Sequence, residues 1–373
     1  MNAGAHIIGG SVKVGRGRAG RATLETGLRG IVKACVVENK ANLEVSLKSL
    51  PGKVVLDVEV PSCTPYRPVW LLTLSLEGRR GRARAYVAIL PVDEESKRKV
   101  VREALRDDKS YSVGALSVAK MRGAYYMAYR WRNGDEARGQ WLEIARSEDG
   151  LEYEEIVKRF NKEDYGYQSF EQPCFIKNSP NTTLLYCADS GSKWDIYLVQ
   201  AKCIEDLDLP GRRVIEHGKD PAALYDNGRY IVVYSNTRNP GHDLTVLETE
   251  DFENFRVLSE SVVYSQLTAQ GNSWARTHIH AGAIMKSGDY YVLLYDALPK
   301  KPSCFGSGWL GMAVSRDLET WIDLTPKAPI WRGNGVDYTF RYVDIVAESD
   351  KYVLYAEEET TKAGRKDIVA YYD

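Results

Sequence analysis

Several features that would assign a protein to a common functional class are missing from this sequence. It has no apolar run of about 18 residues, so no membrane-spanning helix is expected. Its net charge of -1 gives no overall attraction to nucleic acid or to an anionic membrane surface. Residues 1–20 are polar, glycine-rich and basic, without the apolar stretch of a signal peptide. We therefore predict a cytoplasmic protein with no nucleic-acid partner and no membrane partner.

The six cysteines are scattered, and no two form the Cys-x-x-Cys pair typical of zinc sites. Cys174 and Cys187 fall on adjacent predicted strands, where a disulfide is geometrically conceivable, but free thiols are expected in a reducing compartment. We predict no metal and no cofactor. The sequence leaves the oligomeric state open.

What the sequence does contain is a repeat. From about residue 112 to the C-terminus, one pattern recurs five times: a short strand and turn, a strand rich in Tyr, Val and Leu, and a strand that ends in a charged turn. Repeats of about 40–50 residues that hold several strands are typical of β-propellers. We therefore predict an all-β fold with a five-bladed propeller over residues 111–373. The second-strand cores are 124–129, 183–187, 230–234, 290–295 and 351–355.

The first 110 residues do not follow this repeat. Segments 41–50, 54–60, 69–76 and 82–90 are strand-like, and we expect a β-rich, sandwich-like accessory region over 1–110. Residues 92–107 are rich in Glu, Lys and Arg, which predicts a linking helix. Alternatively, one N-terminal strand completes the last blade, because a propeller must close its ring.

The innermost strands of a propeller begin around one central funnel, so register along the repeats predicts its lining. Counting back eight residues from the turn glycines of the third and fourth repeats gives Asp220 and His280. Glu171 and Arg341 stand at the entries of the second and fifth repeats, and His278 shares a strand face with His280. The alternative is that each is a turn residue that faces water.

Motifs in several repeats point to a family. Segments 125–130 and 142–153 look like a first blade, 219–228 is similar to a D-P-x-x-x-x-D-x-G blade opening, and 312–321 contains S-x-D-L-x-x-W. Residues 171–173 read Glu-Gln-Pro where a related group carries Glu-Asp-Pro. Over residues 112–373 the chain resembles the five-bladed β-propeller glycosidase superfamily, including glycoside hydrolase families 43, 32, 62, 117 and 130.

The resemblance implies a glycoside hydrolase that cleaves a glycosidic bond in an oligo- or polysaccharide by acid/base catalysis in the funnel. Such a reaction needs one acid beside the leaving oxygen and a base or nucleophile on the opposite face. We predict that Glu171, Asp220 and His280 are the catalytic groups. Asp220 matches a family 43 position, where the aspartate tunes the pKa of its neighbour.

The sequence departs from the family pattern at three places. Residues 113–116 replace the first-blade aspartate, His280 or Ala281 replaces the fourth-blade glutamate, and Gln172 replaces the catalytic aspartate of family 130. A histidine is the acid in family 117, and imidazole titrates near neutrality. The resemblance therefore allows His280 to act as acid or base.

Other side chains are predicted to bind the saccharide substrate. Trp131 and Trp274 lie beside blade entries, where an indole can stack on the apolar face of a sugar ring; the alternative is that each packs between blades. The remaining predicted substrate-binding residues are Arg130, Arg276, His278, Tyr338 and Arg341.

Two other functions are compatible with these residues. A glycoside phosphorylase would need a cationic phosphate pocket, which Arg130, Arg132, Arg276 and Arg341 would supply. A propeller that binds a carbohydrate or a protein without catalysis is favoured by the absence of the family acids. Two carboxyl groups about 5–10 Å apart would favour hydrolysis, whereas carboxyl groups tied to basic neighbours would favour binding.

Overall fold

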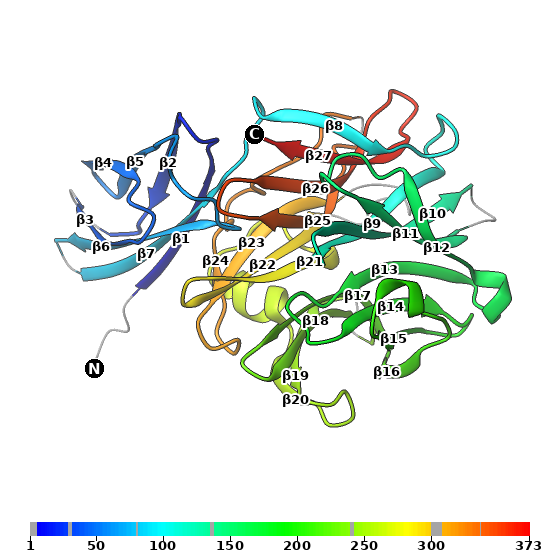
Figure 1. Ribbon diagram of the computed structural model, residues 1–373. Coiled ribbons are helices and arrows are strands. Elements are labelled where there is room, and N and C mark those ends of the chain that lie inside the picture. Colours follow the sequence, from blue (N-terminus) through cyan, green and yellow to red (C-terminus); the bar gives the residue numbers. More distant parts are fainter. Residues whose placement is uncertain are drawn as a thin grey trace.

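The predicted all-β class is confirmed. The computed structural model describes residues 6–28, 32–79, 81–134, 138–238, 242–299, 308–335 and 337–373, and strands dominate it (Figure 1). Its helical elements in these ranges are short: η1 (Lys162–Tyr165), η2 (Ile204–Asp206) and the π-helical turn η3 (Val262–Leu267). None of the described helices is long and apolar enough to cross a membrane.

The repeated part of the chain forms antiparallel groups of four strands. The first group consists of β9 (Tyr111–Met121), β10 (Ala124–Asn133), β11 (Trp141–Ser147) and β12 (Glu155–Asn161). The second consists of β13 (Ser169–Phe175), β14 (Thr182–Asp189), β15 (Trp194–Ala201) and β16 (Arg212–Glu216). The third consists of β17 (Gly218–Asp226), β18 (Arg229–Asn236), β19 (Leu244–Thr249) and β20 (Arg256–Ser259). The next two are β21 (Thr277–Ser287), β22 (Tyr290–Leu298), β23 (Trp309–Ser315) and β24 (Ile322–Asp323); and β25 (Phe340–Ala347), β26 (Tyr352–Glu359), β27 (Lys366–Tyr372) and β8 (Lys97–Arg102).

The innermost strands of these groups form a ring. β9 contacts β13, β13 contacts β17, β17 contacts β21, β21 contacts β25, and β25 returns to β9. Each predicted second-strand core lies on the second strand of a group, namely β10, β14, β18, β22 and β26. These strands are buried over most of their length, which explains their Tyr, Val and Leu content. The arrangement agrees with the five predicted blades.

The helix predicted over residues 92–107 is wrong. The segment contains β8, which pairs antiparallel with β27, so Val100 lies opposite Val369. The outer edge of β27 needs a partner for its backbone groups, and Val101 is buried in the core beside Ile368. Sheet pairing therefore overrides the helix-favouring Lys, Arg and Glu content. The alternative prediction, that an N-terminal strand completes the last group, is the one observed.

The preceding residues form two sheets (left in Figure 1). They share one apolar core, which includes Leu56 from the first sheet and Leu74 from the second. The 110/111 domain boundary remains a prediction, since β8 precedes it but pairs with β27. One sheet is β2 (Arg18–Glu25), β5 (Lys53–Val60) and β4 (Glu44–Leu50); the other is β1 (His6–Lys13), β7 (Gly81–Leu90), β6 (Trp70–Gly78) and β3 (Lys33–Asn39).

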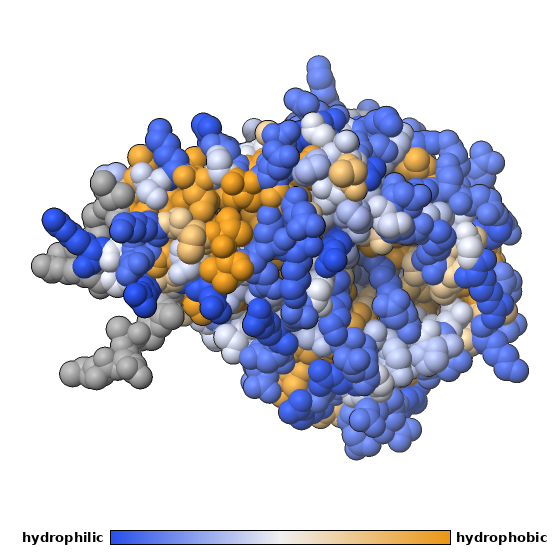
Figure 2. Space-filling view, turned by 60° about the vertical axis from the view of Figure 1, so that its left-hand side comes forward, coloured by the Kyte–Doolittle hydropathy of each residue, from blue (hydrophilic) through white to orange (hydrophobic). Residues whose placement is uncertain are grey.

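The N-terminal sheets pack against the fourth and fifth groups. Their core is continuous with Met312 of β23 and Leu354 of β26. Polar contacts reinforce the junction: the Ser287 hydroxyl donates to the Val69 carbonyl at 2.6 Å, and the Tyr352 hydroxyl donates to the Pro68 carbonyl at 3.1 Å. In Figure 2, hydrophobic residues gather over the side that carries the N-terminal sheets, while hydrophilic residues cover most of the remaining face.

The closest approach at this junction predicts the effect of one methyl group. A Cβ at Gly9 of β1 would overlap the backbone carbonyl of Asp323 in β24, so Gly9→Ala must push the two strands apart. We expect a loss of about 1–3 kcal/mol in the free energy of unfolding, measured by urea denaturation. The control is Gly81→Ala in the same sheet, where the nearest atom to the new Cβ is Leu28 Cδ2 at 3.5 Å. Equal stability of the two variants would contradict this packing.

Candidate active site in the funnel

A bulge near the funnel end of each inner strand shapes the site. The pairing register shifts after Gly114, Glu171, Lys219, Thr277 and Arg341. The residue that follows has a positive φ in four of these strands: Ala115, Asp220, His278 and Tyr342. Bulges re-aim side chains and often lie next to active sites, and a positive φ is unusual for residues other than glycine. The backbone thus holds a ring of side chains at one end of the inner strands.

Asp220 and His280 meet in this ring. Asp220 Oδ2 lies 3.7 Å from His280 Nε2 and 3.2 Å from Lys219 Nζ. Asp220 is fully buried, yet neither carboxylate oxygen accepts a hydrogen bond from any described residue. Buried polar atoms normally have such partners, so this carboxylate points to a ligand or a water molecule.

A second carboxylate holds the imidazole of His280 from the other side. His280 Nδ1 lies 2.8 Å from Asp296 Oδ1, and the ring stacks on Tyr342 with centroids 5.3 Å apart. The other oxygen of Asp296 accepts from the Tyr342 backbone N–H at 3.2 Å. Burial raises the pKa of the Tyr342 hydroxyl, and the nearby Asp220 and Glu171 raise it further, so this ring is neutral. The ring plane of His280 is therefore fixed, and Nε2 faces Asp220.

Glu171 lies on the neighbouring wall and is bound by arginines. Its Oε2 accepts from Arg130 Nε at 2.8 Å, its Oε1 accepts from Arg132 at 3.3 Å, and Arg138 lies 3.9 Å from Oε1. Burial alone would raise the pKa of Glu171, but Arg130, Lys219 and the other arginines hold it well below its ordinary value. Glu171 is therefore a carboxylate at neutral pH.

Arg130 links Glu171 to a second buried glutamate. Its Nη1 donates to the Ser112 hydroxyl at 2.8 Å, and its Nη2 lies 3.4 Å from Glu357 Oε2. Arg341 donates twice to the other oxygen of Glu357, at 3.1 and 2.6 Å. Burial opposes ionisation of Glu357, but Arg341 and Arg130 lower its pKa. The N–H groups of Arg130 and Arg341 thus donate mainly to carboxylates of the protein. We therefore assign both arginines to positioning these carboxylates rather than to direct substrate contact.

Gly114 provides the space for Glu357. A Cβ at this position would clash with the Glu357 carboxylate, and the Ala115 backbone N–H donates to the same oxygen at 3.1 Å. A carboxylate from β26 therefore reaches the funnel end of β9, where it is paired with Arg130 and Arg341.

Comparisons with known proteins agree with this architecture. No protein-family model and no curated protein matches the chain. A solved structure of a glycoside hydrolase has a TM-score of 0.57 at 14% identity, covering 75% of this chain and 92% of that one. A thermostable family-43 glycoside hydrolase has 0.52 at 16%, covering 73% and 92%. The β-1,2-mannobiose phosphorylase from Listeria innocua, in complex with β-1,2-mannobiose, has 0.50 at 14%, covering 73% and 96%.

The fold is that of the β-propeller glycosidases. At these low identities the likeness covers the fold alone, so substrate and reaction must be argued from the site.

The two tryptophans predicted at the rim are not there. The Trp131 indole N–H donates to Glu143 at 2.7 Å, and its ring packs beside Trp141 on the sheet face opposite to Arg130. The Trp274 indole donates to the Thr325 carbonyl at 2.7 Å, and its ring stacks on Tyr295. Both are buried. Trp131 points to the face of β10 opposite to Arg130, and Trp274 lies in the segment between η3 and β21 and packs into the core there. The alternative, packing between blades, is the one observed.

Three other predicted substrate-binding residues are not among the buried side chains that line the funnel. Arg276 is exposed and donates to the Asn272 carbonyl at 3.0 Å, beside η3. His278 is half-buried and its Nδ1 lies 3.0 Å from the Thr277 hydroxyl. Tyr338 is 54% exposed. A role of these three in binding remains a prediction.

The sequence reasoning missed Glu357, Asp296 and Trp194. Asp296 directly follows the tyrosine that ends a second-strand core, in the same position as Arg130 after Tyr129, and Glu357 comes two residues after Tyr355. A polar residue one or two positions behind a Tyr-rich core was therefore a usable signal. Among the described residues, no group of three or more His, Cys, Asp or Glu side chains is arranged to hold a metal ion.

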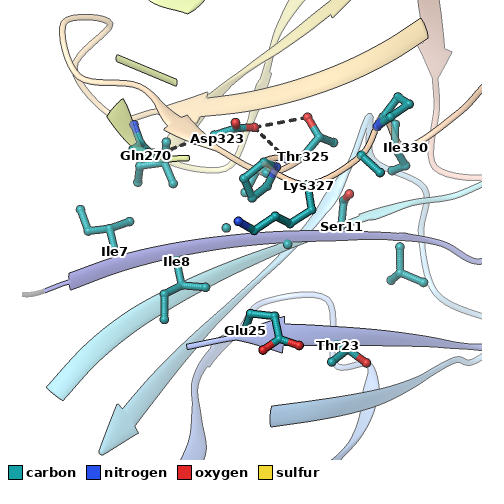
Figure 3. A pocket seen from close by; sticks show the side chains of 18 of the residues that line it. Ile7, Ile8, Ser11, Thr23, Glu25, Gln270, Asp323, Thr325, Lys327 and Ile330 are labelled. Carbon is teal, nitrogen blue, oxygen red and sulfur yellow. Dashed lines mark hydrogen bonds between the residues drawn. The ribbon is translucent and has the colours of Figure 1, made fainter. Parts of the chain in front are cut away.

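A cavity lies away from the funnel, between β1 and the region after β24. It measures about 1240 Å³ and is partly open to solvent. Figure 3 shows Gln270, Asp323 and Thr325 on one wall and Ile7 and Ile8 on the other. The wall that faces β1 is mostly backbone and apolar side chains. The cavity lacks the paired carboxylates and imidazole of the funnel.

The pairing of Glu171 predicts a pH-dependent stability. Because its folded pKa is below the unfolded value, the stabilisation is fully present above a pH of about 4.5 and is lost as the pH falls through the folded pKa. Glu171→Gln should cost about 3–5 kcal/mol at pH 7, since buried arginines lose their counter-charge, and the difference from wild type should narrow in acid. Urea unfolding at pH 7 and pH 3.5 measures both values. The exposed Glu319→Gln is the control, and a cost independent of pH would contradict the assignment.

Proposed function

We propose that the protein is a glycoside hydrolase that binds an oligo- or polysaccharide in the funnel and cleaves a glycosidic bond there by acid/base catalysis. The fold it shares with glycoside hydrolases supports this proposal, as does the β-1,2-mannobiose in the complex of the structurally similar phosphorylase. The observation that carries it is the buried row Asp296–His280–Asp220, which ends in a carboxylate that forms an ion pair with Lys219 but accepts no hydrogen bond from the described residues.

His280 is the acid in this proposal. Asp296 accepts a hydrogen bond from Nδ1, which directs Nε2 toward Asp220 and the substrate. Nε2 donates its proton to the glycosidic oxygen as the bond from that oxygen to the anomeric carbon breaks. Asp220 stabilises and orients His280, the role its family position implies.

Glu171 is the matching base. It is negatively charged at neutral pH, as a base requires, and it accepts the proton of the water that attacks the anomeric carbon. Arg130 and Arg132 hold its carboxylate in place but also lower its basicity. Catalysis is therefore expected to be slower than in a glycosidase whose base is free of arginines.

Binding without catalysis is the second candidate. It is favoured by the arginines on both Glu171 and Glu357, since carboxylates paired in this way are poor proton carriers. A glycoside phosphorylase shares the same funnel and differs in using phosphate in place of water. Measuring turnover with and without phosphate distinguishes the hydrolase, the phosphorylase and the non-catalytic binding protein.

Three substitutions test the proposal against a panel of aryl glycosides. His280→Gln should lower kcat by about 10²–10⁴-fold with little change in KM, because proton donation is lost. Asp296→Asn should lower kcat, because an amide replaces the carboxylate that accepts the hydrogen bond from His280 Nδ1 and holds the ring in place. Asp220→Asn should lower turnover by orders of magnitude while saccharide affinity stays near wild type.

His217→Asn, in the turn between β16 and β17, is the matched control and should keep full turnover. Thermal melting confirms that each variant is folded. Full turnover of His280→Gln would remove His280 from the mechanism. A wild-type protein that binds a saccharide but never cleaves one, with or without phosphate, would move the protein to the binding class.

A further inference from the structure

One aromatic ring lies beside the proposed catalytic groups and is only partly buried where it packs against the core. Trp194, the first residue of β15, is half-buried. Its indole N–H makes no hydrogen bond with the described residues, unlike those of Trp131 and Trp274. A half-exposed, unbonded indole at a site edge has the properties of a platform for a sugar ring.

Two cations flank this ring. The Arg138 guanidinium carbon lies 5.5 Å from the ring centroid, and Lys219 Nζ lies 5.1 Å from it. The same two groups reach the catalytic wall, since Arg138 is 3.9 Å from Glu171 and Lys219 is 3.2 Å from Asp220. Trp194 is therefore continuous with the funnel through Arg138 and Lys219.

The donors of Arg138 are available. Its side chain is 47% exposed, and its contact with Glu171 is longer than a hydrogen bond. Glu171 already binds Arg130 and Arg132, so it has little capacity left for a third arginine. A planar guanidinium beside an aromatic platform matches an anionic oxygen pair, which it binds in a bidentate way.

The local electrostatics agree with an excess of positive charge here. Burial and the neighbouring Lys219 lower the pKa of His242 to about 4. Burial and the neighbouring Arg130 lower the pKa of Arg132 to about 10. Both shifts run in the direction that nearby cations produce, and an anionic ligand would relieve them.

We infer that the funnel takes an anionic saccharide complex, in which Trp194 stacks on a sugar ring while Arg138 and Lys219 bind an anionic group beside it. That group is a sugar carboxylate or a phosphate, since both offer the same oxygen pair. The inference rests on the proposed function, whose substrate class it specifies. Arg138 and Lys219 are specificity residues here, and ordinary cation–π packing of the exposed Arg138 and the buried Lys219 on Trp194 is the competing explanation.

The test compares charged and neutral ligands of the same shape. Uronic-acid trisaccharides and their methyl esters are titrated calorimetrically against the full-length wild type, Arg138→Gln and Trp194→Ala. We expect at least one acid to bind about tenfold or more tightly than its ester, because a charge-assisted hydrogen bond is lost in the ester. Arg138→Gln should reduce that ratio to about two or less, and Trp194→Ala should weaken the acid and the ester alike.

Arg159→Gln is the matched control, since Arg159 also stacks on a tryptophan, Trp141 at 5.1 Å, but outside the funnel ring. It should leave the acid-to-ester ratio unchanged. A parallel experiment with inorganic phosphate identifies the source of the anion. If phosphate competes with the acid for binding, and if cleavage of a neutral disaccharide requires phosphate, the subsite binds phosphate.

The inference is overturned if no acid binds better than its ester and phosphate does not bind, or if Arg138→Gln keeps the preference. Turnover of the same panel separates this result from the proposed function. Cleavage of neutral glycosides without any acid or phosphate preference refutes the inference and leaves the hydrolase. Preferred binding of an acid that is never cleaved refutes the hydrolase and leaves the anionic subsite.

Discussion

The guanidinium of Arg130 is the contact on which the funnel depends. It is wholly buried and bridges Ser112 of β9, Glu171 of β13 and Glu357 of β26, so it ties three of the four-stranded groups together at the axis. A buried ion pair that loses one partner costs about 3–5 kcal/mol, which makes every member of this network dependent on the others. The same network keeps Glu171 and Glu357 ionised, so that they can accept a proton but cannot donate one.

Glu171 and Glu357 are both paired with arginines. Asp220 and His280 lie on the other side of the funnel. Asp220 forms an ion pair with Lys219 but accepts no hydrogen bond from the described residues, and His280 is oriented by Asp296 and Tyr342. The bulges in β17 and β25 aim Asp220 and Tyr342 into this side. The funnel is thus divided into one half whose glutamates are paired with arginines and one half that holds Asp220 and His280.

Much of the fold followed from the sequence, because second-strand cores such as 230–234 are buried on both faces and read as apolar runs. β8 was misread, since its partner β27 is about 270 residues away and local composition favours a helix. Register brought Asp220 and His280 together, since inner strands start at one axis. It could not place Trp131, because a one-residue step turns a side chain from the funnel to the core, nor Trp274, which lies outside the strands. The register of the innermost strands does not reach Asp296 and Glu357, because both lie on second strands.

A crystal structure with a bound oligosaccharide tests the central claim most directly, namely that the funnel is where the saccharide binds. The account predicts a glycosidic oxygen within hydrogen-bond distance of His280 Nε2, with a sugar ring on Trp194 and Asp220 in contact with the ligand. A saccharide seated instead in the cavity between β1 and β24, with the funnel side chains unchanged, would contradict it.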